Sequence, residues 1–424
     1  METELEKLGC IELADIAKDI RCGPFGSAIH KDDYRDSGIP LIRVADTSGP
    51  FVKSDDLAFI DKKLGRELAR HIVKPGDIVV SQRGTIGQFA MVTDEYEQWV
   101  TSANLISILQ SQKADFGYLL AFLNSRAGLS QVIRLQSGQV QPKIITDDVK
   151  SVRVYLPTPD VQRSISDLIR ESCSLLRRSR SLYAEAEALL LAELGLDDLN
   201  LSHQPTYTRS FSQAWATGRL DAEHFQPKYQ YVINAIQHTG QWVVLDEIAT
   251  FCRRGAQPVY VENGPVKVVN TRHLGPMLLS RDLETTSEEY WATHEEAKVR
   301  LNDVLLYSTG AYIGRTNYYP SSERAIGSNH VTIIRTTDVC NHVFLALFLN
   351  ALPGLFQTDQ RAHGSAQREI YPNDIKEFIV WLPDRSKQDT LAQEVIDAHT
   401  AREEANCLLE EAKQRVEEMV LRKE

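Results

Sequence analysis

The sequence predicts a mixed α/β protein with a pseudo-two-fold internal repeat, in which two similar domains are separated by two long helices that form an antiparallel coiled coil. Three observations support this fold class. The two halves of the chain match at a nearly constant offset, which carries position 75 onto position 301. Short apolar stretches alternate with turn residues in each half, which is typical of strands. Each half then ends in a long segment with heptad spacing.

The repeat is clearest where short strands and helices are predicted. Residues 75–81 (Pro-Gly-Asp-Ile-Val-Val-Ser) correspond to residues 301–307 (Leu-Asn-Asp-Val-Leu-Leu-Tyr), and in both an acidic turn precedes an apolar strand. Residues 118–124 and 344–350 both have the pattern of a short amphipathic helix that ends in Asn. Further pairs keep the same offset: Gly138 and Gly364, Gln141 and Gln367, Asp148 and Asp374, and Gln162 and Gln388.

The two long helices are predicted from apolar residues that alternate at spacings of four and three. Small Ala and Ser residues between them would let two helices approach closely. The residues expected to pair the helices are Ile165, Ile169, Leu176, Tyr183, Leu190, Leu391, Val395, Leu409, Val416 and Met419. Equivalent places in a two-fold repeat make the pairing antiparallel. The alternative is that each helix packs only on its own domain.

A chain of 424 residues is too long for one ordinary core and favours two or three domains. We expect similar domains at residues 1–157 and 241–383, each followed by a spacer helix, at 158–195 and 384–424. A connector, residues 196–240, has no counterpart before the first domain.

Composition narrows the classes of function. Hydrophobic residues make up 42% of the chain and charged residues 25%, as in globular proteins. We find no apolar run long enough for a membrane span, no signal-peptide pattern and no C-x-x-C pair among six cysteines, so we expect a cytoplasmic protein without disulfides or zinc. The net charge of −11 argues against strong DNA binding by the chain alone, unless basic groups cluster on one face or a partner supplies phosphate contacts.

Two similar units on a helical spacer are suited to recognising two sites at a fixed distance. A helix over residues 165–190 would be roughly 39 Å long at about 1.5 Å per residue, close to the roughly 34–36 Å of one turn of B-DNA. Divergence between the halves would then give an asymmetric target with an unread gap.

The sequence resembles the specificity subunits of Type I restriction-modification systems over essentially its whole length. The motifs that carry the resemblance are Gly-Pro-Phe-Gly-Ser at 23–27, Gly-Ile-Pro-Leu-Ile-Arg at 38–43, Pro-Gly-Asp-Ile-Val at 75–79, Ser-Gly-Gln-Val-Gln at 137–141, Tyr-Leu-Pro at 155–157 and Leu-Asp-Ala-Glu-His-Phe-Gln-Pro at 220–227. The second half departs from the first of these motifs, with Cys-Arg-Arg-Gly-Ala at 252–256.

This resemblance implies two target-recognition domains that bind double-stranded DNA, and a spacer that also docks methyltransferase (modification) subunits, with motor/nuclease (restriction) subunits joining them. S-adenosylmethionine, ATP and Mg²⁺ are then expected only in the partner subunits, and this chain is expected to be non-catalytic.

Candidate DNA contacts are polar side chains beside the glycine-bearing turns that follow strands, where a scaffold presents variable loops. Arg and Lys suit guanine, and Asn and Gln suit adenine. In the first half we select Arg43, Gln82, Arg83, Thr85, Gln139, Gln141 and Lys143. In the second half we select Asn270, Arg272, His273, Ser308, Thr309, Tyr312, Arg315, His363, Gln367 and Arg368.

Catalytic motifs are absent from the sequence. We find no amine-methylation motif, no glycine-rich cofactor loop, no H-E-x-x-H and no phosphate-binding loop. Asp77 and Asp303 occupy equivalent places, and we interpret both as turn residues at strand entry. Two alternatives stay open: a non-catalytic scaffold that binds protein, and a divergent DNA-processing enzyme with cryptic metal-binding carboxylates.

Overall fold

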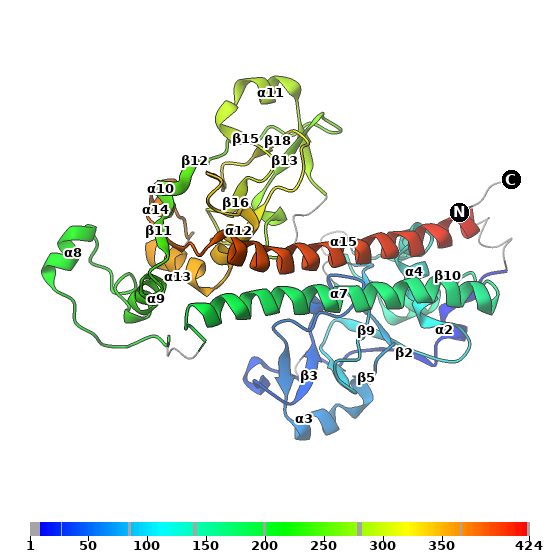
Figure 1. The fold of residues 1–424 in the computed structure, drawn as a ribbon. Helices are drawn as coiled ribbons and strands as arrows, with labels where there is room; N and C mark the ends of the chain where they lie inside the picture. Colours follow the sequence, from blue (N-terminus) through cyan, green and yellow to red (C-terminus); the bar gives the residue numbers. More distant parts are fainter. Residues whose placement is uncertain are drawn as a thin grey trace. The chain divides into compact units, whose positions relative to one another are not determined.

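The computed structural model describes residues 9–26, 28–83, 86–138, 142–197, 201–277, 282–364 and 367–421 (Figure 1). The chain divides into two compact units. Unit 1 contains the residues up to Leu176 together with those from Glu403 onward, and unit 2 contains Arg177–Arg402. Each unit therefore includes part of both long helices. The domain boundaries given above stay a prediction.

Unit 1 is built on three small sheets. Two of them have four strands, in the orders β2-β9-β6-β7 and β4-β3-β8-β5, and the third pairs β1 with β10. All pairs are antiparallel except β3 with β8. The strands are β1 (Ile11–Glu12), β2 (Asp19–Cys22), β3 (Ile39–Ile42), β4 (Ala58–Ile60), β5 (Ile72–Val73), β6 (Ile78–Ser81), β7 (Phe89–Met91), β8 (Trp99–Thr101), β9 (Leu105–Leu109) and β10 (Arg153–Val154).

Unit 2 repeats this topology strand for strand. Its four-stranded sheets have the orders β12-β19-β16-β17 and β14-β13-β18-β15, and β11 pairs with β20. Its one parallel pair among the described strands, β13 with β18, is again at the equivalent place. The strands are β11 (Trp242–Val244), β12 (Ala249–Arg254), β13 (Val266–Val269), β14 (Glu284–Thr286), β15 (Lys298–Val299), β16 (Val304–Tyr307), β17 (Thr316–Tyr318), β18 (Ala325–Gly327), β19 (Val331–Thr336) and β20 (Ile379–Trp381).

The helices follow the same repeat. In unit 1 the shorter ones are α2 (Leu13–Ile16), α3 (Lys62–Glu67), α4 (Phe116–Asn124), α5 (Arg126–Leu135) and α6 (Thr146–Lys150), with 3₁₀ turns η1 (Lys31–Asp33), η2 (Val44–Thr47) and η3 (Ala69–His71). Their counterparts in unit 2 are α10 (Leu245–Ile248), α11 (Glu288–Thr293), α12 (His342–Asn350), α13 (Leu352–Arg361) and α14 (Pro372–Lys376), with η4 (Thr271–His273) and η5 (Glu295–Ala297). The long helices are α7 (Pro159–Glu193) and α15 (Arg385–Leu421). The mixed α/β class and the internal repeat are therefore confirmed.

The connector adds two helices, α8 (Phe211–Thr217) and α9 (Pro227–His238), which have no counterpart in the described part of unit 1. Pro227 begins α9, at a position where its missing N–H costs nothing. Val232 and Ile236 of α9 belong to the core of unit 2. No helix in the described parts of the chain is long and apolar enough to cross a membrane.

The core of each unit is centred on a short helix that is apolar on all sides. In α4 every residue from Phe116 to Leu123 is buried, and in α12 every residue from Val343 to Leu349 is buried. The Asn at the end of each helix holds the neighbouring strand through both atoms of its amide. Asn124 accepts from the Phe89 N–H (3.2 Å) and donates to the Phe89 carbonyl (2.9 Å). Asn350 makes the same two bonds to Thr316, at 2.8 and 2.6 Å.

In unit 1 the long helices pair in opposite directions. The Ser172 hydroxyl of α7 donates to the Ala405 carbonyl of α15 (2.9 Å), and Arg415 donates to the Ser164 hydroxyl (3.2 Å). As the residue number falls from 172 to 164 along α7, the number of its partner rises from 405 to 415 along α15, so the two helices are antiparallel. The predicted pairing residues in this core are Ile165, Ile169 and Val416, with Leu176, Leu409 and Met419 packed against it.

Unit 2 pairs the other halves of the same helices. Lys387 of α15 lies 2.7 Å from the Glu193 carboxylate of α7. The predicted residues Tyr183, Leu190, Leu391 and Val395 are all buried in one cluster with the rest of this unit's core. The antiparallel arrangement of α7 and α15 is thus confirmed. In each unit, residues of both helices also belong to the same core as residues of the sheets and short helices, so pairing between the helices and packing on the domains occur together.

Candidate nucleic-acid interface

The loop after β6 meets a later hairpin in unit 1. Arg83 pairs with Lys143, and Lys143 pairs with Ser137, all antiparallel. The Ser137 N–H donates to the Lys143 carbonyl (3.0 Å), and the Lys143 N–H donates to the Ser137 carbonyl (2.9 Å). Gly138, with φ of 95°, makes the turn in a conformation that favours glycine. We call Arg83, Ser137 and Lys143 the first bridge cluster.

Unit 2 has the same arrangement at the equivalent positions of the repeat. Thr309 pairs with Glu369, and Glu369 pairs with His363. The His363 N–H donates to the Glu369 carbonyl (2.7 Å), and the Glu369 N–H donates to the His363 carbonyl (2.9 Å). Gly364, with φ of 80°, makes the turn. We call Thr309, His363 and Glu369 the second bridge cluster.

The first bridge cluster presents cations to solvent. Arg83 and Lys143 are both exposed. Beside them Gln82 is half-buried, and its amide donates to the Cys22 sulfur (2.9 Å). Exposed Arg and Lys side chains near an amide are the groups that contact phosphates and the edges of bases.

Other residues selected in the first half are placed differently. The Arg43 guanidinium donates to the buried carboxylate of Asp46 (3.0 and 3.1 Å), and this bond raises the pKa of Arg43. Arg43 therefore holds the turn at η2. Thr85, Gln139 and Gln141 lie outside the described residues.

A carboxylate occupies the centre of the second bridge cluster. Glu369 accepts from Arg254 (2.5 Å), from the Tyr371 hydroxyl (2.9 Å) and from the Thr309 hydroxyl (3.2 Å). The bond from Arg254 is the main cause that lowers the pKa of Glu369. The Arg254 guanidinium also lies over the Tyr371 ring, 4.8 Å from its centroid. At this place unit 2 therefore has a carboxylate paired with an arginine, where unit 1 has an exposed lysine side chain.

A second polar group in unit 2 forms around η4. The Asn270 amide donates to Glu284 (3.0 Å), and Arg272 pairs with the same carboxylate. His273 is buried, its Nδ1 accepts from the Asn270 N–H (2.9 Å), and its Nε2 lies 3.2 Å from Glu284. Burial is the main cause that lowers the pKa of His273, and the Arg272 Nε–H also donates to its Nε2 (3.2 Å).

The residues around β16 divide into buried and exposed sets. Ser308 is fully buried, and its hydroxyl is 2.5 Å from the Thr332 hydroxyl. Tyr312 is 57% exposed, and the Arg315 guanidinium stacks on its ring at 3.8 Å from the centroid. Ser308 and His273 are buried and hydrogen-bonded within the unit, and their contact with DNA stays a prediction.

The remaining selected residues lie near the second hairpin. The His363 ring is 3.3 Å from Asp374, and Arg368 pairs with Asp359 (2.8 Å). Gln367 is exposed. The structure thus brings Thr309, His363, Gln367 and Arg368 to one hairpin.

The two aspartates at equivalent positions of the repeat, Asp77 and Asp303, act as turn residues, as the sequence indicated. Asp77 accepts from the N–H groups of Lys74 and Gln110 (both 2.8 Å). Asp303 accepts from the Arg300 N–H and the Arg335 guanidinium (both 2.7 Å). Within the described ranges, no group of three or more His, Cys, Asp and Glu side chains is placed to hold a metal ion.

Residues 11–172 match the sequence model of the family described as Type I restriction modification DNA specificity domain. This range contains the ten strands of unit 1 and the first bridge cluster, and unit 2 repeats the same strand order. Residues 11–172, which lie in unit 1 and make up less than half of the chain, are thus similar to this DNA specificity domain. The search of the curated proteins found no match to this chain.

Solved structures similar to this chain include an S subunit of a Type I system from M. genitalium, with 12% identity, 97% of this chain and 94% of that chain covered, and a TM-score of 0.47. A structure titled for complex assembly and conformational transition of the type I R-M system has 16% identity, 97% coverage of both chains and a TM-score of 0.31. The HsdS subunit from Thermoanaerobacter tengcongensis has 16% identity, 96% and 95% coverage and a TM-score of 0.30.

Sequence reasoning missed Glu369 and Arg254. A signal for the first was available, because Glu369 is the repeat equivalent of Lys143 and so reverses the charge at that place. Arg254 belongs to the stretch that departs from the first half, where Cys22 is the topological counterpart at the end of β2. Its contact with Glu369 joins β12 to a hairpin far away in the sequence, which no local pattern indicates.

Proposed function

We propose that this chain is a Type I restriction-modification specificity subunit, and that it recognises an asymmetric bipartite DNA target, one part of which is bound by each unit. The observation that supports this proposal is the divergence of the two bridge clusters on one repeated scaffold. Lys143 in unit 1 corresponds to Glu369 in unit 2, and Arg83 corresponds to Thr309. A lysine or arginine suits the acceptors of guanine, whereas a carboxylate accepts from the amino group of cytosine. The same loop position would therefore favour different bases in the two units.

The proposed contacts are the selected residues that lie near the two hairpins and are at least partly exposed. They are Gln82, Arg83 and Lys143 in unit 1, and Thr309, Tyr312, Arg315, His363, Gln367 and Arg368 in unit 2. Arg43, Asn270 and Arg272 belong to the turns η2 and η4, and we propose that they act mainly by fixing these turns through their acidic partners. Thr85, Gln139 and Gln141 remain predicted contacts.

We further propose that the chain is non-catalytic and directs partner methyltransferase and restriction subunits to the target. S-adenosylmethionine, ATP and Mg²⁺ would then be bound by those partners. The net charge of −11 supports this division, because phosphate contacts normally need an excess of Lys and Arg. A partner with basic surfaces would supply the affinity, and this chain would supply the choice of sequence.

The test is methylome sequencing of cells that co-express this chain with the methyltransferase subunit of its system. We expect one motif with two different half-sequences and an unread gap. Lys143→Glu should alter or abolish recognition of one half-sequence only, and Glu369→Lys should affect the other. Lys62→Glu, an exposed lysine on α3, is the matched control and should leave the motif unchanged.

A single uninterrupted motif, or identical half-sequences, would refute the asymmetric target. Methylation or cleavage by the purified chain alone would refute the non-catalytic role.

A further inference from the structure

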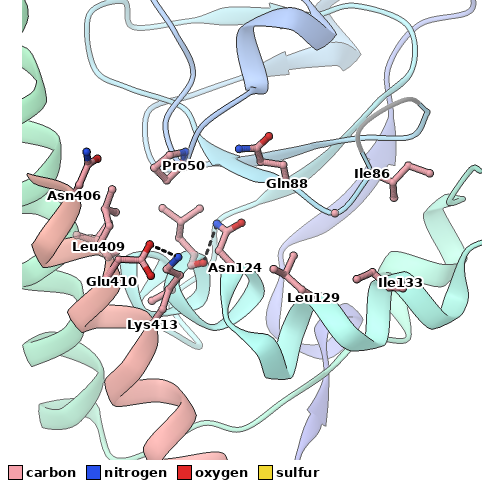
Figure 2. Close-up of a pocket in the computed structure, with 14 residues that line it drawn as sticks. Pro50, Ile86, Gln88, Asn124, Leu129, Ile133, Asn406, Leu409, Glu410 and Lys413 are labelled. Atoms are coloured by element: carbon pink, nitrogen blue, oxygen red, sulfur yellow. Dashed lines mark hydrogen bonds and ion pairs between the residues drawn. The ribbon is translucent and has the colours of Figure 1, made fainter. Parts of the chain in front are cut away.

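Unit 1 contains a pocket of about 460 Å³ between α4, α5, the loop at 86–88 and the part of α15 that belongs to this unit (Figure 2). Its lining is mainly apolar. Leu120, Ala121 and Ile169 are almost fully buried, and Leu129 and Leu409 line it as well. This volume lies within the roughly 300–1,000 Å³ of typical small-molecule sites, which combine apolar walls with a few polar groups.

The polar groups at this pocket are already paired with one another. Glu410 and Lys413 form an ion pair (2.5 Å). The Asn124 amide is bonded to Phe89 and donates to the Leu120 carbonyl (3.2 Å), as Figure 2 shows for the latter bond. Gln88 is another polar side chain that lines the pocket. A charged ligand would find no unpaired counter-charge among the described lining residues, so the pocket suits a neutral one.

The equivalent position in unit 2 indicates which kind of group fits the unit 1 pocket. Leu409 is the repeat equivalent of Tyr183, and Asn350 is the repeat equivalent of Asn124. In unit 2 Tyr183 is only 7% exposed, and its buried hydroxyl lies near Asn350 without a hydrogen-bond partner among the described residues. A phenol ring therefore occupies, in unit 2, the place next to the helix-ending Asn where unit 1 has the smaller Leu409.

Packing around the equivalent glycines agrees with this difference. A Cβ built on Gly314 of unit 2 would lie 3.1 Å from Leu355 and Thr358. The same atom built on Gly87, which lines the unit 1 pocket, would lie 3.6 Å from Leu129 and Val132. Unit 2 is thus closed more tightly at this place than unit 1.

We propose that the pocket of unit 1 is a binding site for a small neutral aromatic molecule, between phenol and indole in size. The ring would lie against Leu120, Ala121 and Leu409, as Tyr183 lies in the core of unit 2. The ligand would contact both α15 and the loop at 86–88. That loop follows Arg83 of the first bridge cluster closely in the chain, so occupancy of the pocket would restrain the segment next to the proposed DNA contacts.

The test uses the full chain, with phenol, p-cresol and indole as probes at millimolar concentration. Leu409→Tyr should fill the pocket and abolish probe binding, whereas Leu409→Met, which nearly conserves the side-chain volume, should retain it. Tyr183→Leu should open the equivalent space in unit 2 and add a second site. Saturation-transfer NMR measures binding, and titration calorimetry gives the number of sites.

Wild-type protein provides a test that does not depend on a variant's folding. With methyl-labelled protein, we expect intermolecular NOEs from the probe to the methyl groups of Ile86, Leu129 and Leu409. Absence of binding by all three probes, or NOEs only to methyl groups elsewhere, would overturn the proposal. Unchanged binding by a folded Leu409→Tyr variant would overturn it too. The proposed DNA recognition does not depend on either result.

Discussion

At the scale of single residues, the two units differ in the side chain at one equivalent position, which is Lys143 in unit 1 and Glu369 in unit 2. Lys143 is exposed in unit 1, whereas its counterpart Glu369 is bonded by Arg254, Tyr371 and Thr309. A carboxylate with several donors is fixed in position and stays ionised. Because the pKa of Glu369 is lowered in the folded state, its contribution to stability is present above its unfolded pKa and is lost as the pH falls through the folded value.

Removing the main donor should reverse this shift. We expect Arg254→Ala to raise the pKa of Glu369 toward its ordinary value, because the bond from Arg254 is the largest cause of the lowered pKa. NMR titration of the labelled Glu369 carboxyl carbon measures this. Arg253→Ala is the control, because the guanidinium of this neighbouring arginine lies near a different side chain, 5.9 Å from the Phe251 ring centroid. An unchanged titration in Arg254→Ala would contradict the assigned cause.

At the scale of elements, the junction of α4 and α5 has no room for a side chain at Gly128. A Cβ there would lie 2.5 Å from the Phe122 carbonyl oxygen and 2.6 Å from that of Leu123. Unit 2 has the same restriction at Gly354, where a Cβ would lie 2.4 Å from the Leu349 backbone. The contacts are with backbone, which cannot move aside as a flexible side chain can.

Gly128→Ala should therefore destabilise unit 1 by roughly 1–3 kcal/mol, the usual cost of forcing extra atoms into a packed site. Urea unfolding, followed with a probe in unit 1, measures the change. Gly49→Ala is the matched control and should change stability by less than about 0.5 kcal/mol, because the nearest atom to a Cβ there is 4.0 Å away. Equal effects of the two substitutions would show that backbone crowding is not the cause.

The pairing of α7 and α15 also depends on small residues. Ala412 is fully buried in the core of unit 1, and Ala186 has the same place in unit 2. The two alanines are equivalent positions of the repeat. Small residues at such positions let helices approach closely, and a larger side chain would push them apart.

We expect Ala412→Leu to lower the stability of unit 1 by roughly 1–3 kcal/mol through overpacking. Gln414→Leu adds the same residue at an exposed position of α15 and should be nearly neutral. Thermal unfolding by circular dichroism compares the two variants. A Gln414→Leu loss as large as that of Ala412→Leu would point to a general effect of leucine on the helix.

At the scale of the whole molecule, the acidic balance limits what the chain can do by itself. With a net charge of −11, the isolated protein has little electrostatic attraction to duplex DNA. The proposed contacts are local groups of polar and basic side chains, which can select a sequence without supplying most of the affinity.

We therefore expect weak binding to duplex DNA by the chain alone and much tighter binding after the proposed methyltransferase partner is added. Fluorescence anisotropy over a range of salt concentrations measures both. If Lys143 contacts a phosphate, Lys143→Ala should reduce the slope of log K against log salt by about 1 in the complex. Lys62→Ala should leave that slope unchanged, and equal slopes for all three proteins would remove Lys143 from the phosphate contacts.

The sequence by itself determined the repeat, the mixed α/β class and the two long antiparallel helices. These features are visible in sequence because they come from periodic patterns: apolar strands after acidic turns, and heptad spacing from Ile165 to Leu190 and from Leu391 to Met419. It also indicated that Asp77 and Asp303 belong to turns, and the hydrogen bonds of both carboxylates agree.

Only the tertiary structure decided which polar loop residues face solvent. Ser308 and Tyr312 are both polar and both close to a glycine turn, yet one is fully buried and the other is 57% exposed. Glu369 is organised by Arg254, which lies far earlier in the chain, and Leu409 leaves open a space that Tyr183 fills in unit 2. Periodicity reports which face of an element is buried, whereas the surroundings of a single side chain depend on contacts between segments far apart in sequence.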